Sequence, residues 1–303
     1  MTMLRAGTRG SQLAWTQAGQ ALEHIANRLG DGYEFERVRI DTKGDRDRAT
    51  ALKAMPGTGL FTKEIEAALL AGEVDLAIHS LKDVPFDVRP GTELHMLPRQ
   101  DPRDALISPH GGIDDLPRGA RVGTGSPRRI AQLRHRRPDL RFSDLRGNLD
   151  TRLRRLDDGE FDAIVLAAAG LSRLGWNDRI AQRVDPAICL PAFGQGTLAV
   201  QCRADSDVSV LLERAADPGA TLCANLERAL MRALGGGCKR ALAALAEIVP
   251  DGVLVRGAIG DPRTGDVVRL AWLGTRDASI AAMESLAIDL LDAASEAGLD
   301  ADA

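Results

Sequence analysis

The sequence predicts an α/β protein with two doubly wound parts, followed by a smaller α+β part. Short apolar runs alternate with helical patterns, and this alternation is typical of parallel strands covered by helices. The order of strand, glycine-containing turn and helix occurs twice, once after residues 4–8 and again after residues 121–123. From residue 218 the composition shifts towards alanine, and two alternating strands lie between two helical patterns.

The composition is that of an ordinary globular protein with room for two or three domains. The chain has 303 residues, of which 44% are hydrophobic and 27% charged, and its net charge is -4. No apolar run approaches the ~18–20 residues that span a bilayer, and the start lacks the apolar region of a secretory signal. We therefore expect a cytoplasmic protein without a membrane contact.

The four cysteines lie far apart, at positions 189, 202, 223 and 238, and none forms a C-x-x-C pair. This spacing gives no indication of a metal site or of a redox pair. The chain also lacks the basic excess and the many aromatic residues that are typical of nucleic-acid binding, because it has only three Trp, one Tyr and six Phe. The sequence therefore predicts no metal and no nucleic-acid partner.

In the first part of the chain, the residue pattern predicts a strand, a helix that begins after the N-cap Ser11, and a second strand. A helix N-terminus beside Arg9 favours an anion, although a simple cap explains Ser11 equally well. A long segment without periodicity follows, which we interpret as a lid. The expected elements are strands at 4–8, 35–40 and 74–78, helices at 12–29 and 62–71, and the lid at 42–59.

The segment from His79 to Pro85 directly follows the predicted strand 74–78. In open parallel sheets, ligands bind at the carboxyl ends of the strands. Lys82 and Asp83 are therefore candidates for a chemical role, and a surface ion pair at a turn is the alternative. We interpret His79 as structural.

The second part begins near residue 104 and places arginines after its strands. Ser126 and Pro127 predict a helix start, so Arg128 and Arg129 fall in the first turn, where the helix dipole disfavours cations. This placement indicates an anionic ligand, and solvated arginines are the alternative. The arginines at or past strand ends are Arg9, Arg128, Arg129, Arg146, Arg152 and Arg173, and Asn148 is a candidate N-cap between Arg146 and Arg152.

Arginine matches carboxylate geometry, and each charge-assisted hydrogen bond contributes about 1.5–3 kcal/mol. The strand-end arginines therefore predict a ligand with several carboxylates. Among these cationic side chains, an ionised Asp83 could stabilise a cationic intermediate or transfer a proton. Cys238, on a glycine-rich turn, is a candidate nucleophile or attachment point, and an inert small hydrophobic residue is the alternative.

Eight motifs, in order along nearly the whole chain, resemble the hydroxymethylbilane synthases, also called porphobilinogen deaminases. They are Arg9-Gly-Ser11, residues 59–64 with Phe61, residues 79–85 with Lys82 and Asp83, Asp101-Pro-Arg-Asp104, residues 122–129, residues 145–148, residues 190–196 with Gln195, and Gly236-Gly-Cys238.

The resemblance implies two periplasmic-binding-protein-like α/β domains with the active cleft between them, and a third domain that carries a covalent dipyrromethane cofactor on Cys238. The implied domains are 1–99 with 198–217, then 100–197, then 218–303. The implied enzyme is a transferase of tetrapyrrole (haem-type) biosynthesis, and a monomer. It joins four porphobilinogen molecules head to tail with loss of ammonia and releases linear hydroxymethylbilane by hydrolysis.

The resemblance also assigns roles to individual residues. Asp83 matches the catalytic aspartate, which assists the loss of ammonia, stabilises the resulting cation and helps to deprotonate the ring. The cofactor-binding residues are Cys238, Lys82, Ser126, Arg128, Arg129, Arg146 and Gly147. The substrate-binding residues are Arg9, Ser11, Lys53, Phe61, Arg152, Arg173 and Gln195, with Lys53 on the lid and Gln195 in a hinge.

Three positions depart from the family pattern. Thr58 stands where many relatives carry Lys, and Gly125 stands where many relatives carry Ser. Lys239-Arg240 follows Cys238, where the family usually has an apolar or small-polar run. The alternative from another functional class is a non-enzymatic two-domain binder of small polycarboxylates, which predicts no covalent group. A nucleic-acid stripe over residues 128–137 is a weaker alternative.

Overall fold

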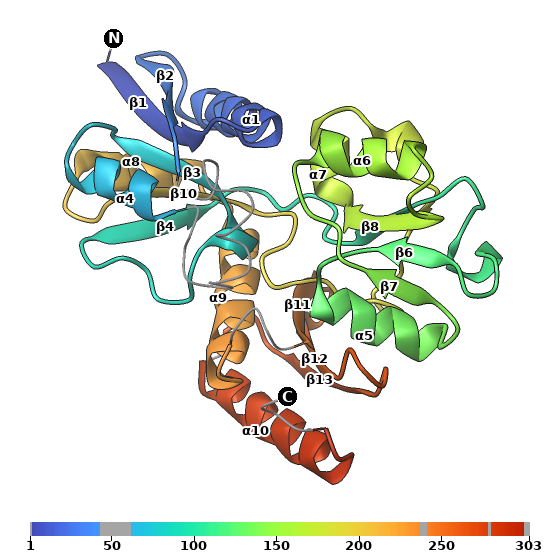
Figure 1. Cartoon of the computed structure of the whole chain (residues 1–303). Helices are drawn as coiled ribbons and strands as arrows, with labels where there is room; N and C mark the ends of the chain where they lie inside the picture. The colour runs from blue at the N-terminus through green and yellow to red at the C-terminus, as the bar shows by residue number, and fades with distance from the viewer. Residues whose placement is uncertain (1, 43–61, 237–240, 278–279, 300–303) are drawn as a thin grey trace. The chain divides into compact units, whose positions relative to one another are not determined.

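The computed structural model describes residues 2–42, 62–236, 241–277 and 280–299 (Figure 1). Lys53, Phe61, Cys238 and nearly all of the predicted lid lie outside these ranges. By their internal contacts the residues form two compact units, Met1–Gln100 with Thr197–Leu222 and Asp101–Gly196 with Cys223–Ala303. The described residues contain two five-stranded sheets and one three-stranded sheet.

The first unit is built on a mixed five-stranded sheet in the order β2-β1-β3-β10-β4. Three strands run parallel, and β10 runs antiparallel to its neighbours β3 and β4. The late strand β10 thus joins the first sheet. The bounds are β1 (Thr2–Arg9), β2 (Tyr33–Ile40), β3 (Leu76–Ser80), β4 (Thr92–Met96) and β10 (Leu198–Arg203).

Helices cover both faces of this sheet. On one face the core contains residues of α1 (Gln12–Leu29) and α8 (Asp207–Ala215), and on the other it contains residues of α4 (Lys63–Leu70). The strand β3 shows how the sequence produces this arrangement, because successive side chains of a strand point to opposite faces. Leu76 and Ile78 enter the α1 core, while Ala77 enters the α4 core.

The second unit contains a sheet in the order β7-β6-β8-β5-β9. The three strands β6, β7 and β8 are parallel, whereas β5 runs antiparallel to β8. One core contains residues of α5, and the core on the other face contains residues of α6 and α7. The bounds are β5 (Asp104–Ile107), β6 (Arg121–Gly123), β7 (Arg141–Ser143), β8 (Ala163–Ala167), β9 (Gln182–Arg183), α5 (Pro127–Arg136), α6 (Leu149–Asp157) and α7 (Ala168–Arg173).

The carboxyl-terminal residues form an antiparallel sheet of β11 (Ala241–Val249), β12 (Gly252–Gly260) and β13 (Val267–Gly274), with the helices α9 (Pro218–Ala233) and α10 (Ile280–Glu296). The strand β11 was not predicted, because its alanines favour a helix in isolation. Pairing with β12 along its whole length and burial of six residues override that preference. A Cβ at Gly257 would lie 2.5 Å from Leu290 Cδ1, so a glycine lets α10 pack closely against β12.

This third sheet packs within the second unit. Leu190, Ala243, Leu245 and Ala258 share a buried cluster. The α5 residue His135 places its Nδ1 3.0 Å from the carbonyl oxygen of Gly265. A separate third domain beginning at residue 218 stays a prediction, since the contacts divide the chain into two units rather than three.

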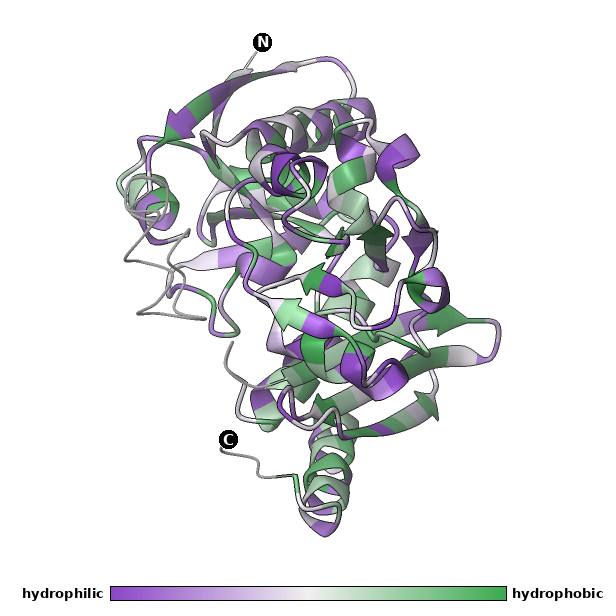
Figure 2. Cartoon of the chain, turned by 45° about the vertical axis from the view of Figure 1, so that its right-hand side comes forward, coloured by the Kyte–Doolittle hydropathy of each residue, from purple (hydrophilic) through white to green (hydrophobic). Residues whose placement is uncertain are grey.

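The predicted α/β class is confirmed: two five-stranded sheets covered by helices are accompanied by a small α+β part. In Figure 2 hydrophobic residues gather along the strands and along α10. Among the described residues, no helix has the length and the apolar character needed to cross a membrane.

Candidate active site

In the first unit, Arg9, Ser11, Lys82 and Asp83 lie at the carboxyl edge of the parallel strands. Arg9 is the last residue of β1, and Ser11 caps α1, its side chain accepting a hydrogen bond from the backbone N–H of Ala14 at 3.3 Å. The strand β3, parallel to β1, ends at Ser80 and leads into the 3₁₀ turn Leu81–Asp83. The structure therefore brings both predicted motifs to one edge of one sheet.

The turn Leu81–Asp83 separates a buried anchor from an accessible carboxylate. Leu81 has no exposed surface, and its N–H donates to the carbonyl oxygen of Thr197 at 3.0 Å. Lys82 is half-buried and Asp83 is exposed. The carboxylate of Asp83 thus projects from a fixed backbone and is accessible to a ligand.

His79, two positions before this turn, is structural as predicted. It is buried, and its Nε2 lies 3.1 Å from Oε1 of Gln201, which is a hydrogen-bond acceptor. Gln201 in turn donates to Oγ1 of Thr92 at 2.7 Å. Burial lowers the pKa of His79 to about 4, so the ring is neutral near pH 7.

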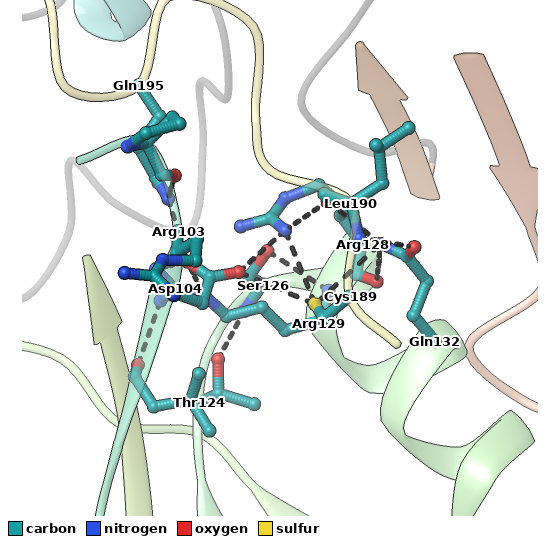
Figure 3. Close-up of polar contacts among 12 residues, drawn as sticks. Arg103, Asp104, Thr124, Ser126, Arg128, Arg129, Gln132, Cys189, Leu190 and Gln195 are labelled. Carbon is teal, nitrogen blue, oxygen red and sulfur yellow. Dashed lines mark hydrogen bonds and ion pairs between the residues drawn. The ribbon is translucent and has the colours of Figure 1, made fainter. Parts of the chain in front are cut away.

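In the second unit, the predicted helix start is confirmed: Ser126 is the N-cap of α5, and its side chain accepts a hydrogen bond from the N–H of Arg129. Arg128 and Arg129, in the first turn, are 5% and 8% exposed. Both guanidinium groups meet the fully buried carboxylate of Asp104, the first residue of β5 (Figure 3). A carboxylate of the chain itself therefore meets the two first-turn arginines, and the anionic ligand that they predict stays a prediction.

Asp104 accepts hydrogen bonds from four side chains, those of Arg128, Arg129, Gln195 and Cys189, whose Sγ lies 3.4 Å from Oδ2. Nη1 of Arg128 donates to Oδ2 at 2.7 Å, and Nη2 and Nε of Arg129 donate to Oδ1 at 2.7 and 3.1 Å. Gln195 Nε2 donates to Oδ1 at 2.9 Å. Burial alone would raise the pKa of Asp104, but the charges of Arg128 and Arg129 outweigh it and hold that pKa far below its usual range.

The two arginines differ in how many of their guanidinium nitrogen atoms donate hydrogen bonds to protein oxygen atoms. Arg129 directs Nε, Nη1 and Nη2 to Asp104 and to the carbonyl oxygen of Val165. The hydrogen bonds of Arg128 to Asp104 and to the carbonyl oxygen of Leu190 all leave from Nη1, as Figure 3 shows. Arg128 is therefore the better placed of the two to donate to a further carboxylate, while ligand binding by both stays a prediction.

Arg146, Gly147 and Arg152 follow β7. Arg146 is exposed, and its Nε donates to Oδ2 of Asp144 at 2.5 Å. Gly147 has φ +109°, a conformation that favours glycine, and its carbonyl oxygen accepts from Nε of Arg152 at 2.8 Å. Asn148 is the N-cap of α6, as predicted, but its side chain makes no capping hydrogen bond.

The departure at Gly125 has a local structural counterpart. A Cβ at this position would lie 2.5 Å from Oδ1 of Asp144, the same carboxylate that pairs with Arg146. A serine there would displace the Asp144 side chain, whereas glycine lets the Asp144–Arg146 pair form. The substitution is thus coupled to the position of a predicted cofactor-binding arginine.

Arg173 and Gln195 are both buried. Nη2 of Arg173 donates to the carbonyl oxygen of Gly196 at 2.7 Å, and burial lowers the pKa of Arg173 to about 10. The Gln195 amide, 1% exposed, is bound to Asp104 and to the carbonyl oxygen of Pro102. These contacts fix the loop 190–196 against β5, and substrate binding by the two side chains stays a prediction.

Sequence reasoning assigned no role to Asp104, although it lies in one of the eight motifs. The available signal was a carboxylate at the start of the buried apolar strand Asp104–Ile107. A carboxylate in that setting requires cationic partners, because an unpaired buried charge is very costly. The nearby first-turn arginines could have been recognised as those partners.

Two family models match the chain. The model "Porphobilinogen deaminase, dipyromethane cofactor binding domain" covers residues 4–210, and "Porphobilinogen deaminase, C-terminal domain" covers residues 221–292. The chain belongs to the porphobilinogen deaminase family. The sequence resemblance is therefore confirmed over nearly the whole length.

Relatives named porphobilinogen deaminase agree with this membership. One from Syntrophobacter fumaroxidans is 42% identical over 293 residues, covering 96% of this chain and 94% of its own. One from Bordetella parapertussis is 46% identical over 294 residues, covering 95% and 92%. One from Shouchella clausii is 46% identical over 261 residues, covering 84% of both chains.

Proposed function

We propose that the chain is a hydroxymethylbilane synthase, a transferase of tetrapyrrole (haem-type) biosynthesis. It condenses four porphobilinogen molecules head to tail, releases one ammonia at each step, and frees linear hydroxymethylbilane by hydrolysis. The observation that carries this proposal is membership of the porphobilinogen deaminase family through matches that together span residues 4–292. The non-enzymatic binder of polycarboxylates is not favoured.

The cationic side chains fit a dipyrromethane cofactor, whose pyrrole rings carry acetate and propionate groups. Arg128 engages Asp104 through Nη1, Arg146 is exposed, and Ser126 begins a ten-residue helix whose N-terminus favours anions. Bound through Cys238, this group supplies the pyrrole to which the first substrate is joined. The residues that would hold it are Lys82, Ser126, Arg128, Arg129, Arg146, Gly147 and Cys238.

Asp83 is the proposed catalytic residue. Its exposed carboxylate can accept a hydrogen bond from a pyrrole N–H and so stabilise the cation that forms when ammonia leaves the substrate. After the new carbon–carbon bond forms, the same carboxylate can take up the ring proton. General acid–base assistance of this kind contributes typically about 10²–10⁴-fold to a rate.

The proposed substrate-binding residues differ in accessibility. Arg9, Ser11 and Arg152 are half-buried, so part of each side chain faces solvent and is available to an acetate or propionate. Arg173 and Gln195 are buried and already bound to the protein, which favours a role in shaping the loop 190–196. Lys53 and Phe61 complete the proposed set and lie outside the described residues.

The test is the turnover of porphobilinogen by Asp83→Asn, with Asp205→Asn as its matched control. Both substitutions neutralise an exposed carboxylate in the first unit, and Asp205 belongs to no proposed site. We expect Asp83→Asn to keep its fold and its covalent cofactor and to lose at least ~100-fold in hydroxymethylbilane formation. Near-normal product formation by Asp83→Asn would show that this residue is not the catalytic carboxylate.

We further propose that the enzyme works as a cytoplasmic monomer without a nucleic-acid partner. The acidic net charge and the scarcity of aromatic residues support the second point. Light scattering of the purified protein measures the mass in solution. A mass of one chain is expected, and a stable dimer at micromolar concentration contradicts the proposal.

A further inference from the structure

Glu93, His95 and Cys202 form a cluster of metal-ligating groups at the edge of the first sheet. Glu93 and His95 lie on the edge strand β4, and Cys202 lies on β10. Cys202 pairs with Leu76 at the start of β3, whereas Asp83 follows the end of β3. We propose that this cluster, which lies near the start of β3 whereas Asp83 follows its end, binds a divalent transition-metal ion of the zinc type.

Strand geometry places the three side chains on one face. Glu93 and His95 are two positions apart on β4, so they point to the same side, and Cys202 is the direct cross-strand partner of Glu93. Nε2 of His95 lies 3.1 Å from Oε1 of Glu93, and Sγ of Cys202 lies 3.8 Å from the same oxygen. One ligand atom of each residue lies within 4.8 Å of the others.

Two of these separations lie close to those of a tetrahedral metal site. Zinc bonds of about 2.0–2.3 Å at tetrahedral angles place neighbouring ligand atoms roughly 3.3–3.5 Å apart. The distances from Oε1 of Glu93 to His95 Nε2 and to Cys202 Sγ, 3.1 and 3.8 Å, lie on either side of that range. A metal could therefore be accommodated by small side-chain movements, with three protein ligands and a water molecule in the fourth position.

The surroundings hold the ligands in place and leave a path for the ion. Cys202 has no exposed surface and His95 is 8% exposed, while the Glu93 side chain is 38% exposed. Ser209 of α8 donates a hydrogen bond to Oε1 of Glu93. Such outer partners fix ligand orientation, and their removal typically lowers metal affinity about 10–100-fold.

The donor set selects the metal class. Thiolate and imidazole ligands favour zinc and related transition ions, whereas magnesium and calcium prefer oxygen ligands throughout. On binding, the S–H bond of Cys202 breaks, the proton passes to solvent, and a sulfur–metal bond forms. Since the metal must displace this proton from a buried thiol, we expect weaker binding than in a structural four-cysteine zinc site.

The experiment is a titration of the full-length holoprotein with Co²⁺, followed by competition with Zn²⁺. We expect one ion per chain, with a thiolate-to-cobalt charge-transfer absorption that Zn²⁺ abolishes. Cys202→Ala should lose this absorption, and Glu93→Gln, a substitution at a partly exposed position, should weaken binding at least ~10-fold. The control Cys223→Ala removes a buried thiol of α9 outside the cluster and should bind like the unaltered protein.

Two results would overturn the proposal. One is Co²⁺ binding without a thiolate absorption, which would place the ion elsewhere. The other is unchanged affinity in both Cys202→Ala and Glu93→Gln, which would leave the cluster as a group of hydrogen bonds centred on Glu93. Metal-free unfolding curves of the variants show whether each one is folded before it is titrated.

Discussion

Replacing Asp104 with Asn should destabilise the second unit strongly. The side chain has no exposed surface and accepts hydrogen bonds from Arg128, from Arg129 and from Gln195. Asparagine keeps the shape of the side chain but removes its charge. Its NH₂ group replaces one carboxylate oxygen, so an N–H donor then faces the N–H donors that this oxygen had accepted from. The guanidinium groups of Arg128 and Arg129, whose side chains are 6% and 9% exposed, lose their counter-charge.

The size of the effect follows from burial. Removing one partner of a buried ion pair costs about 3–5 kcal/mol, because an uncompensated charge stays inside. The free energy of unfolding of a whole domain is only ~5–15 kcal/mol. At roughly 2–4 °C per kcal/mol, the melting temperature should fall by about 6–20 °C.

The assay is urea and thermal unfolding of Asp104→Asn beside Asp114→Asn. Asp114 makes a bidentate pair with Arg136 through Nε and Nη2 at 3.2 and 2.9 Å, but its side chain is 59% exposed. Exposed pairs of this kind contribute ~0–1 kcal/mol. Similar losses in the two variants would refute the account of Asp104 as a buried charge centre.

The Asp104 contribution also has a defined pH dependence. The folded pKa of Asp104 lies below its ordinary value of 3.8, so its stabilisation is complete above about pH 4 and declines as the solution becomes more acidic. The difference in stability between the unaltered protein and Asp104→Asn should therefore stay constant from pH 5 to 8. A difference that shrinks steadily across that interval contradicts this assignment.

Three further predictions concern the buried side chains of Arg128, His79 and Glu227. Arg128→Leu should reduce the dipyrromethane adduct seen by intact mass in the folded protein, and an unchanged adduct contradicts the anchoring role. Burial lowers the pKa of His79 from 6.5 to about 4, so the free energy of unfolding should fall by about 3 kcal/mol as the pH drops from 7 to 4. Urea unfolding curves of His79→Gln should lack this fall. An equal fall in His79→Gln would contradict the assignment of the pH dependence to His79. Glu227 is fully buried, and its carboxylate accepts hydrogen bonds from the N–H groups of Gly194 and Ala246 at 2.6 and 2.7 Å. Glu227→Ala should therefore lower the free energy of unfolding in urea by about 2–4 kcal/mol. A loss below about 1 kcal/mol would contradict a stabilising role of these two hydrogen bonds.

Local signals in the sequence predicted most of the elements. Helix α1 begins after the N-cap Ser11 and ends at Leu29, as its cap and apolar spacing indicated. The pair Ser126-Pro127 fixed the start of α5 in the same way. Such caps act within one turn, so neighbouring residues are enough to reveal them.

Long-range pairings could not be predicted in this way. Asp104 meets Arg128 across the fold, and the strand β11 forms because a partner strand outweighs the helical preference of its alanines. Cys202 lies far along the chain from Glu93 and His95, so cysteine spacing predicted no metal site. In each case the partner is supplied by the sheet topology, which no local pattern contains.

We propose a covalent dipyrromethane on Cys238 in an enzyme that polymerises porphobilinogen. The most direct measurement is the intact mass of the chain purified from a cell that makes porphobilinogen. We expect the polypeptide mass plus two linked pyrrole units, and loss of this addition in Cys238→Ser. A bare polypeptide mass, or an addition that persists in Cys238→Ser, would contradict it.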